Sequence, residues 1–309
     1  MKKSFLFSTT ALWAGPTAHW AGRLLPVPFK ASSKPTHANR ISAVMKRIMF
    51  VIAAISMANA VSAQDWAKAR LEKSPRHLEW VKVKQGKREV NCFVAYPEVK
   101  DKATAVVVIH EIFGLTDWVR GVADQLADAG YIAIAPDLLS GAAPKGGGTA
   151  EFGSDDAVRA AIPSLPPDQI TADLNAVLDY VSKLPACNGK VAVTGFCWGG
   201  AQTFRLATNN KSVKAAFPFY GTGPDKEEDI ARINAPVYGF YGGNDARVNA
   251  TVPKSTELMK KAGKTYEPVI YEGAGHGFLR AGEAPDAGAA NKKARDEAWQ
   301  RLKELLKKI

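Results

Sequence analysis

Apolar and polar residues follow two different periods along this chain. Residues 78–84 and 90–96 alternate between apolar and polar, and a glycine-containing stretch at 85–88 lies between them, which predicts an antiparallel hairpin. Elsewhere, short runs of mostly apolar residues predict further strands, and the continuous β-branched run at 105–109 predicts a strand that is buried on both faces. These runs occupy residues 105–109, 131–135, 191–194, 215–220, 237–241 and 267–271.

A helical period separates these runs, with apolar residues three or four positions apart. It predicts helices over residues 118–129, 170–184, 201–207 and 287–308. We expect Asp168 to cap the second of these helices. In the last helix, the residues expected to face inward are Ala290, Ala294, Ala298, Leu302, Leu305 and Leu306.

Strands that alternate with helices predict an α/β fold with a doubly wound, mostly parallel sheet. The antiparallel hairpin is expected at one edge of this sheet. Residues 138–165 follow neither period and contain three consecutive glycines at 146–148. We expect them to form an irregular excursion over the sheet, with a short helix near residues 155–161.

The first 63 residues do not fit this globular pattern. Lys46 and Arg47 precede an apolar run, and small residues at Val61 and Ala63 favour cleavage before Gln64, as in a secretory signal peptide at 45–63. The run is too short to predict a membrane span, so we expect a periplasmic or secreted protein without a stable membrane anchor.

Residues 1–44 are rich in Ser, Thr, Pro, Trp and Arg and contain no Asp or Glu. A transit peptide or a weak second signal could have this composition. We interpret the segment as an unfolded extension upstream of a start at Met45. The remaining residues, 64–309, are predicted to form a single α/β domain.

The formal net charge of +11 comes mostly from this leader. Residues 1–63 hold eight of the 41 Lys and Arg residues and none of the 30 acidic residues. The mature chain therefore has 33 basic and 30 acidic residues, a net charge of +3. A charge this small gives no support for nucleic-acid binding.

The sequence contains three cysteines, Cys92, Cys187 and Cys197. In an exported protein, Cys92 could pair with Cys187 and leave Cys197 free. We expect no disulfide, because Cys92 lies in a predicted strand, Cys187 follows a predicted helix, and no pattern brings the two together.

Cys197 occupies the centre of a Gly-x-nucleophile-x-Gly pattern at residues 195–199. A predicted strand precedes this pattern and a predicted helix follows it, which is the context of a nucleophile elbow. Such a turn exposes the nucleophile at the carboxyl edge of the sheet, next to a helix N-terminus that favours negative charge. The sequence therefore indicates a catalytic thiol at Cys197.

A thiol nucleophile needs a base, and the base needs an acid that orients it. Asp245 follows the predicted strand 237–241, and His276 follows the predicted strand 267–271. The order nucleophile, acid, histidine is the order found in α/β-hydrolases. We expect Cys197, Asp245 and His276 to form a catalytic triad.

Residues 110–114, His-Glu-Ile-Phe-Gly, follow the first predicted parallel strand and should lie beside the elbow. The backbone N–H of Ile112 and that of Trp198 are the expected donors of an oxyanion hole. Glu111 is an unusual residue at this position. Its negative charge would disfavour a thiolate at Cys197, but its carboxylate could accept the proton of the thiol.

Together these motifs resemble the dienelactone hydrolase family, the carboxymethylenebutenolidases, over residues 78–306. The motifs that carry the resemblance are residues 110–114, 195–200, Asp245 and 275–278. The resemblance implies that Cys197, Asp245 and His276 are the triad. It also implies that Glu111 contacts the resting thiol and helps to generate the thiolate when substrate arrives.

The resemblance further implies an anion site for a substrate carboxylate. Arg280 matches one family arginine, and Arg159 is the candidate for a second one in a variable region. Two features depart from the family pattern: Gly277 follows the histidine where Ser is frequent, and the leader is unusual for cytoplasmic enzymes. Both departures bear on the identity of the substrate more than on the chemistry.

The expected function is hydrolysis of a small ester or lactone through an acyl-cysteine, without metal or organic cofactor. We expect a monomer that binds a small-molecule substrate and no nucleic acid. One alternative is a general carboxylesterase or thioesterase with another substrate. A second alternative is a non-catalytic module that binds small acidic ligands, against which the intact Cys, Asp and His argue.

The leader generates the first testable prediction. N-terminal sequencing of the mature protein, purified from its native host, should begin at or near Gln64, because the small residues before it form the expected cleavage site. A mature protein that retains Met45 and remains in the cytoplasm would contradict the predicted export.

Overall fold

The computed structural model of the protein describes residues 65–309, so the predicted extension and signal peptide lie outside the described residues. The strands are β1 (Leu78–Gln85), β2 (Arg88–Ala95), β3 (Ala103–Ile109), β4 (Ile132–Pro136), β5 (Cys187–Phe196), β6 (Ala216–Phe219), β7 (Val237–Gly242) and β8 (Tyr266–Tyr271). The helices are α2 (Asp65–Glu72), α3 (Asp117–Asp128), α4 (Asp155–Ala161), α5 (Pro167–Ser182), α6 (Trp198–Asn209), α7 (Glu227–Ala231), α8 (Ala246–Asn249), α9 (Val252–Lys261), α10 (Phe278–Ala281) and α11 (Ala289–Leu306).

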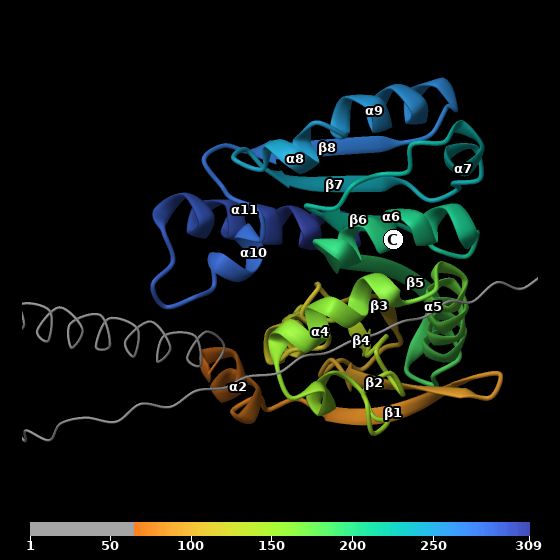
Figure 1. Ribbon diagram of the computed structural model, residues 1–309, viewed down its shortest axis with the longest axis vertical. Helices are drawn as coiled ribbons and strands as arrows, with labels where there is room; N and C mark the ends of the chain where they lie inside the picture. The colour runs from red at the N-terminus through yellow and green to blue at the C-terminus, as the bar shows by residue number, and fades with distance from the viewer. Residues whose placement is uncertain (1–64) are drawn as a thin grey trace, which may run out of the picture. The chain divides into compact units, whose positions relative to one another are not determined.

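Within the described residues, the strands form one eight-stranded sheet in the order β1-β2-β4-β3-β5-β6-β7-β8 (Figure 1). β1 and β2 form an antiparallel hairpin at one edge, and β2 is antiparallel to β4. All other neighbouring strands are parallel. The predicted α/β fold, with its edge hairpin and mostly parallel sheet, is confirmed.

The connections that follow β3 and β5 lead in opposite directions across the sheet. It passes from β3 outward to β4 and then returns to β5 on the other side of β3. The loops that follow β3 and β5 therefore diverge at a topological switch point, where α/β sheets form their ligand-binding crevices. Cys197 directly follows β5, so the predicted nucleophile lies at this switch point.

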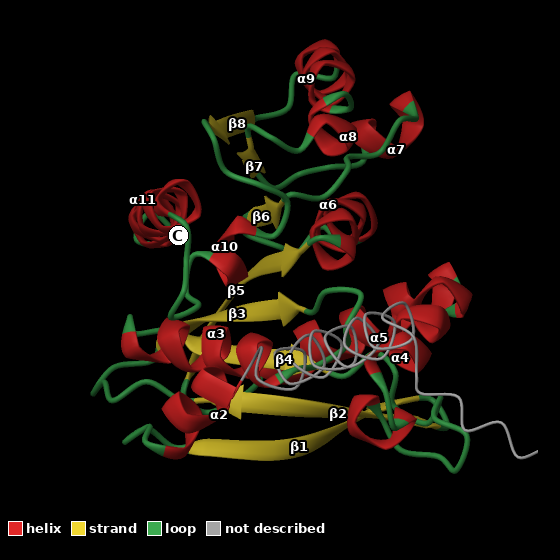
Figure 2. Ribbon diagram, turned by 60° about the vertical axis from the view of Figure 1, so that its left-hand side comes forward, coloured by secondary structure: helices red, strands yellow, loops and turns green. Residues whose placement is uncertain are grey.

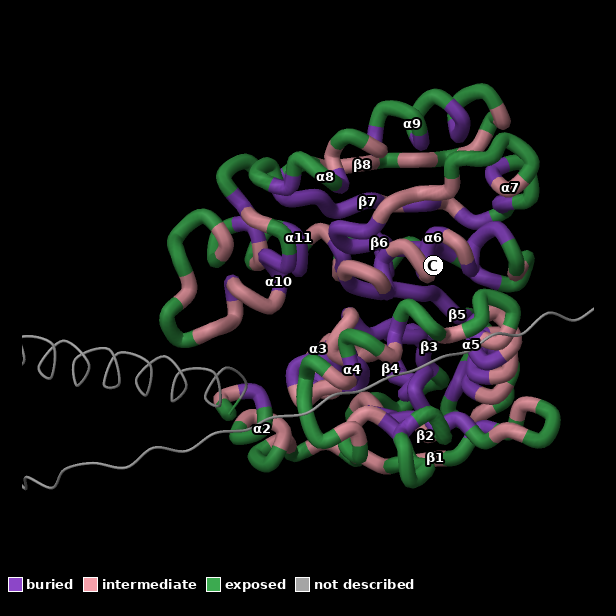
Figure 3. Tube along the Cα trace, in the orientation of Figure 1, coloured by how far each residue is buried: buried purple, intermediate pink, exposed green. Residues whose placement is uncertain are grey.

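Helices cover both faces of the sheet (Figure 2). Side chains alternate along β3, so that Val106 and Val108 pack toward α3 and α11, whereas Val107 and Ile109 pack toward α5 and α6. The inner parallel strands, β3 to β7, are buried along most of their length, whereas the edge strand β8 buries only Tyr271 (Figure 3). Two hydrophobic layers thus enclose the sheet.

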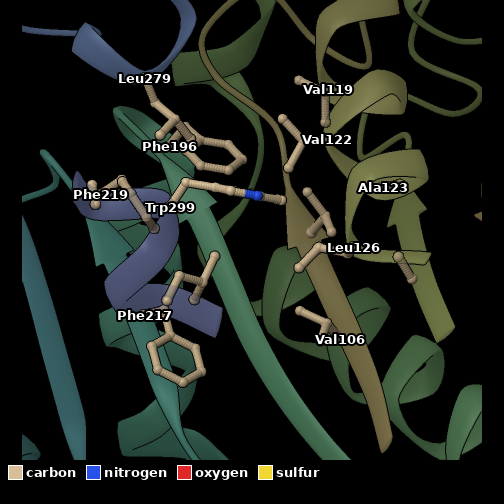
Figure 4. Close-up of a cluster of buried hydrophobic side chains, with 14 of the residues drawn as sticks. Val106, Val119, Val122, Ala123, Leu126, Phe196, Phe217, Phe219, Leu279 and Trp299 are labelled. Atoms are coloured by element: carbon tan, nitrogen blue, oxygen red, sulfur yellow. The ribbon is translucent and has the colours of Figure 1, made fainter. Parts of the chain in front are cut away.

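On one face, the apolar side of α3 packs against aromatic residues that come from three other elements. Val119, Val122 and Leu126 lie opposite Phe196, and Trp299 of α11 completes the cluster (Figure 4). Phe196 ends β5 directly before Cys197, and its ring lies 4.9 Å from that of Trp118. This packing fixes the end of β5 beneath the predicted site.

Two expectations about helices need correction. Asp168 does not cap its helix, because α5 begins at Pro167 and Asp168 lies inside the first turn. A proline is tolerated at the first helical position, because a backbone N–H there would have no acceptor within the helix. Ala290 does not face inward: it is exposed in the first turn of α11, whereas Ala294, Ala298 and Leu302 are buried.

Residues 138–165 contain α4 where a short helix was expected, preceded by a 3-10 turn at Thr149–Phe152. Leu139, Val158 and Ile162 form a small buried cluster of their own. The excursion is thus packed onto the site through apolar contacts. Among residues 65–309, no helix combines the length and apolarity that crossing a bilayer requires.

Candidate active site

Cys197 lies in the turn between β5 and α6, at the carboxyl edge of the sheet. Its φ is +56°, in the left-handed region, where a residue other than glycine is strained. The turn is held by its backbone: the Cys197 N–H donates to the Phe219 carbonyl at 3.1 Å, and its carbonyl accepts from Ala201. The strand, sharp turn and helix expected of a nucleophile elbow are all present.

The glycines around Cys197 are required by close backbone contacts. A Cβ atom at Gly195 would collide with the Gly199 carbonyl, and one at Gly199 would collide with the His110 carbonyl. A Cβ atom at Gly200 would collide with the Phe219 carbonyl. The start of α6 can therefore lie against the ends of β3 and β6 only because these positions have no side chain.

The three predicted triad residues lie in one hydrogen-bonded line. His276 Nε2 is 3.0 Å from the Cys197 sulfur, and His276 Nδ1 is 2.5 Å from Asp245 Oδ2. Asp245 is the N-cap of α8, and its other oxygen accepts from the Val248 N–H at 3.3 Å. The carboxylate is buried and has a fixed orientation, so it can orient the imidazole ring.

The surroundings of His276 favour its charged form. The pKa of His276 is raised to about 9. The hydrogen bond to Cys197 is the largest cause, and the hydrogen bond to Asp245 adds to it, whereas burial lowers the pKa. A protonated ring donates a hydrogen bond from each nitrogen, so it stabilises a thiolate at Cys197 and the carboxylate of Asp245. The ring of His276 thus lies where it can exchange a proton with the Cys197 sulfur.

The predicted oxyanion loop lies beside the elbow. Its turn is closed by a hydrogen bond of 3.2 Å from the Gly114 N–H to the Glu111 carbonyl. Ile112 and Trp198 pack together against the cluster of Leu139, Val158 and Ile162. Trp198 is the first residue of α6, so its N–H has no acceptor within the helix. The structure thus brings the two expected donors into one region.

Glu111 does not have the hydrogen bond that was expected of it. Its buried carboxylate accepts from Arg280 Nε at 2.9 Å, whereas the Cys197 sulfur is paired with His276. Burial raises the pKa of Glu111, and the guanidinium of Arg280 opposes this rise. The physical reason is that a buried carboxylate requires a charged partner, and Arg280 provides one.

The two candidate anion-binding arginines both adjoin the oxyanion loop. The guanidinium of Arg280 lies 5.4 Å from the ring centre of Phe113, and that of Arg159 lies 5.8 Å from the same ring. Arg159 is half exposed and makes a loose ion pair of 3.5 Å with Asp156. Arg159 is therefore held only by a long ion pair at the surface, whereas Arg280 is hydrogen-bonded to the buried Glu111.

Two residues of the site were not predicted from the sequence. Tyr220 is fully buried at a φ of +38°, its ring lies 5.2 Å from that of His276, and its hydroxyl has no hydrogen-bond partner among the described residues. His110 is fully buried beside Glu111 and Trp198. The available signal was position alone, since each residue directly follows a parallel strand.

The other thiols and the acidic residues do not form a second site. Cys92 and Cys187 are free and buried, and burial raises the pKa of Cys92, which keeps that thiol neutral and unreactive. Within residues 65–309, no group of three or more His, Cys, Asp or Glu side chains could hold a metal ion.

The pKa of His276 generates a prediction about stability. Because folding raises this pKa from 6.5 to about 9, the stabilisation is complete below pH 6.5 and is lost as the pH rises through 9. Denaturant unfolding of wild type and His276→Gln should therefore differ most at acidic pH, with the difference shrinking toward pH 9. A difference that stays constant or grows with pH would contradict the assignment.

Comparison with known proteins shows the family of the chain. A profile of the Dienelactone hydrolase family matches residues 90–309. A relative from Salmonella typhimurium, named “Putative carboxymethylenebutenolidase”, is 33% identical over 228 residues, which are 70% of this chain and 82% of the relative. A relative of the same name from Escherichia coli is 34% identical over 213 residues, 65% of this chain and 76% of the relative.

Solved structures give the same result. The chain is similar to a “Putative Dienelactone Hydrolase” from Klebsiella pneumoniae, with 26% identity, a TM-score of 0.66, and coverage of 76% of this chain and 99% of the other. A dienelactone hydrolase-like promiscuous phosphotriesterase from metagenomic libraries, 23% identical with a TM-score of 0.63 over 75% of this chain and 98% of the other, shares the fold. The chain therefore belongs to the dienelactone hydrolase family, hydrolases with the α/β-hydrolase fold.

Proposed function

We propose that the protein hydrolyses a small ester or lactone through an acyl-enzyme at Cys197. The observation that carries this proposal is the line from Asp245 through His276 to Cys197, with separations of 2.5 and 3.0 Å. A thiol in a strained turn at a helix N-terminus, with an oriented imidazole on its sulfur, is the arrangement required of a cysteine nucleophile.

The reaction divides into two steps. The Cys197 thiolate attacks the carbonyl carbon of the substrate, and the N–H groups of Ile112 and Trp198 stabilise the oxyanion of the tetrahedral intermediate. The intermediate collapses, the C–O bond to the leaving group breaks, and the His276 imidazolium protonates the departing alkoxide. His276 then removes a proton from water, the hydroxide attacks the thioester carbonyl, and the C–S bond breaks, which releases the carboxylic acid and regenerates the Cys197 thiolate beside the His276 imidazolium.

Arg280 and Glu111 bear on the choice of substrate. A substrate carboxylate that binds Arg280 competes with Glu111 for the same guanidinium, which is 2.9 Å from Glu111 in the described conformation. Glu111 would then be freed to act on the thiol, consistent with a thiol-activating role. Arg159, across the ring of Phe113, is the proposed second contact for the anion.

Two other functions remain possible outcomes of the tests. A general carboxylesterase or thioesterase would use the same triad with another leaving group, and a panel of substrates separates it from a lactone hydrolase. A non-catalytic module for small acidic ligands would bind without turnover. The intact triad line favours catalysis over binding alone. Export of the mature chain and a monomeric state are also part of the proposal.

Removal of the thiol gives the direct test of this function. Purified mature protein is assayed on a panel of small lactones, esters and thioesters. Cys197→Ala should abolish hydrolysis, and Cys197→Ser should leave at most weak activity, because a hydroxyl is far harder to deprotonate than a thiol.

Cys92→Ala is the matched control, since it removes a buried thiol that lies outside the site. It should keep the activity of wild type. Hydrolysis that persists in Cys197→Ala would show that the nucleophile is a different group, and binding without turnover by wild type would favour the binding module.

The anion site is tested with a matched pair of substrates, one ester that carries a carboxylate and one neutral ester. Arg280→Ala should raise KM for the carboxylate ester about 10- to 150-fold, the loss of one charge-assisted contact, and should change KM for the neutral ester little. KM for each ester is obtained from initial rates.

Arg280→Ala also leaves the buried Glu111 without its partner, which disturbs the site by itself. The double variant Glu111→Gln, Arg280→Ala removes both charges and serves as the control. If both variants raise KM equally for the two esters, the proposed role of Arg280 in binding the carboxylate is wrong.

A further inference from the structure

His110 is a buried polar side chain to which the catalytic steps above give no role. It directly follows β3, and its ring is 0% exposed. Nδ1 lies 2.8 Å from the Glu111 carbonyl oxygen, and Nε2 lies 3.3 Å from the Leu138 backbone nitrogen. The ring is also stacked on Trp198, with centres 5.5 Å apart and planes at 18°. Both ring nitrogens therefore have hydrogen-bond partners, and one face of the ring is covered by Trp198.

These contacts determine which nitrogen carries the proton. The Leu138 N–H can only donate, so His110 Nε2 must be the acceptor. A neutral imidazole then carries its proton on Nδ1, which donates to the Glu111 carbonyl. Burial lowers the pKa of His110, in agreement with a neutral ring.

The hydrogen bond to the Glu111 carbonyl has a consequence for Ile112. In a trans peptide, the carbonyl of one residue and the N–H of the next point in opposite directions from one rigid plane. The Glu111 carbonyl is fixed from one side by His110 Nδ1 and also accepts from the Gly114 N–H at 3.2 Å. The direction of the Ile112 N–H is thereby fixed as well.

The same ring contacts the side chain of Trp198, the residue whose N–H is the second expected donor. Trp198 begins α6, and its indole is stacked on His110 at the point where Gly199 lies against the His110 carbonyl. One side chain thus touches both segments that supply oxyanion donors, the loop after β3 and the start of α6.

We propose that His110 is a positioning residue for the oxyanion hole: its Nδ1–H holds the Glu111–Ile112 peptide so that the Ile112 N–H faces the reacting carbonyl oxygen. This inference rests on the proposed hydrolysis by Cys197. It predicts that His110 affects stabilisation of the transition state and leaves substrate binding nearly unchanged.

The test compares an ester with its thionoester, in which sulfur replaces the carbonyl oxygen. Sulfur is a weak hydrogen-bond acceptor, so the thionoester gains little from oxyanion donors. His110→Phe keeps a ring that can stack on Trp198 but cannot donate to Glu111. It should lower kcat for the ester about 10- to 100-fold with KM nearly unchanged, and should lower the thionoester rate much less.

His110→Asn is the matched variant, because its amide nitrogen lies near the position of Nδ1 and can still donate to the Glu111 carbonyl. Its ratio of ester to thionoester rates should stay close to that of wild type. Equal losses on both substrates in His110→Phe, or an Asn variant as impaired as the Phe variant, would overturn the proposal.

A measurement on wild type covers the case in which the variants do not fold. The ring ¹⁵N resonances of His110 should show protonated Nδ1 and unprotonated Nε2 at neutral pH. A proton on Nε2 would overturn the proposal. Failure of the proposed hydrolysis can be distinguished from failure of the His110 proposal. In that case wild type would hydrolyse no ester, or Cys197→Ala would remain active, whichever nitrogen of His110 carries the proton.

Discussion

The site depends on one backbone constraint, the close approach of α6 to the ends of β3 and β6. Gly199 and Gly200 permit this approach, since a Cβ atom at either position would collide with a carbonyl of a neighbouring strand end. In the turn between β5 and α6, Cys197 has a φ of +56°, and its sulfur lies 3.0 Å from His276 Nε2. The hydrophobic layers on both faces of the sheet hold this strain in place, because Phe196, directly before the turn, is packed in one of them.

Two charge pairs then set the electrostatics of the crevice. His276 with Asp245 presents a protonated imidazole to the sulfur, and Arg280 with Glu111 holds a buried carboxylate in place. The pairs differ in exposure: the Glu111 carboxylate is 5% exposed, whereas the His276 side chain is 34% exposed and can be reached by substrate. In the proposed reaction, a substrate carboxylate would therefore alter the second pair while the first pair performs proton transfer.

The sequence predicted the fold, and it singled out Cys197, Asp245 and His276, which the structure joins by hydrogen bonds. Period-two and period-3.6 patterns locate the strands and helices, and polar residues after parallel strands must meet at one edge. The sequence did not show that Asp168 lies inside its helix or that Ala290 is exposed, because helix propensity does not locate the first residue of a helix. It also could not give the partner of Glu111, which depends on the approach of Arg280 from a segment 169 positions away. The unpaired Tyr220 hydroxyl needed the same kind of three-dimensional information.

The central claim is that Cys197 forms a covalent acyl intermediate, and mass spectrometry can detect it directly. Wild-type protein is mixed with a slowly hydrolysed ester, quenched in acid during turnover, and digested. The account predicts that the peptide containing Cys197 gains the mass of the acyl group and loses it on treatment with neutral hydroxylamine, which cleaves thioesters. Turnover without any adduct on Cys197, or with the acyl group on another residue, would contradict the account.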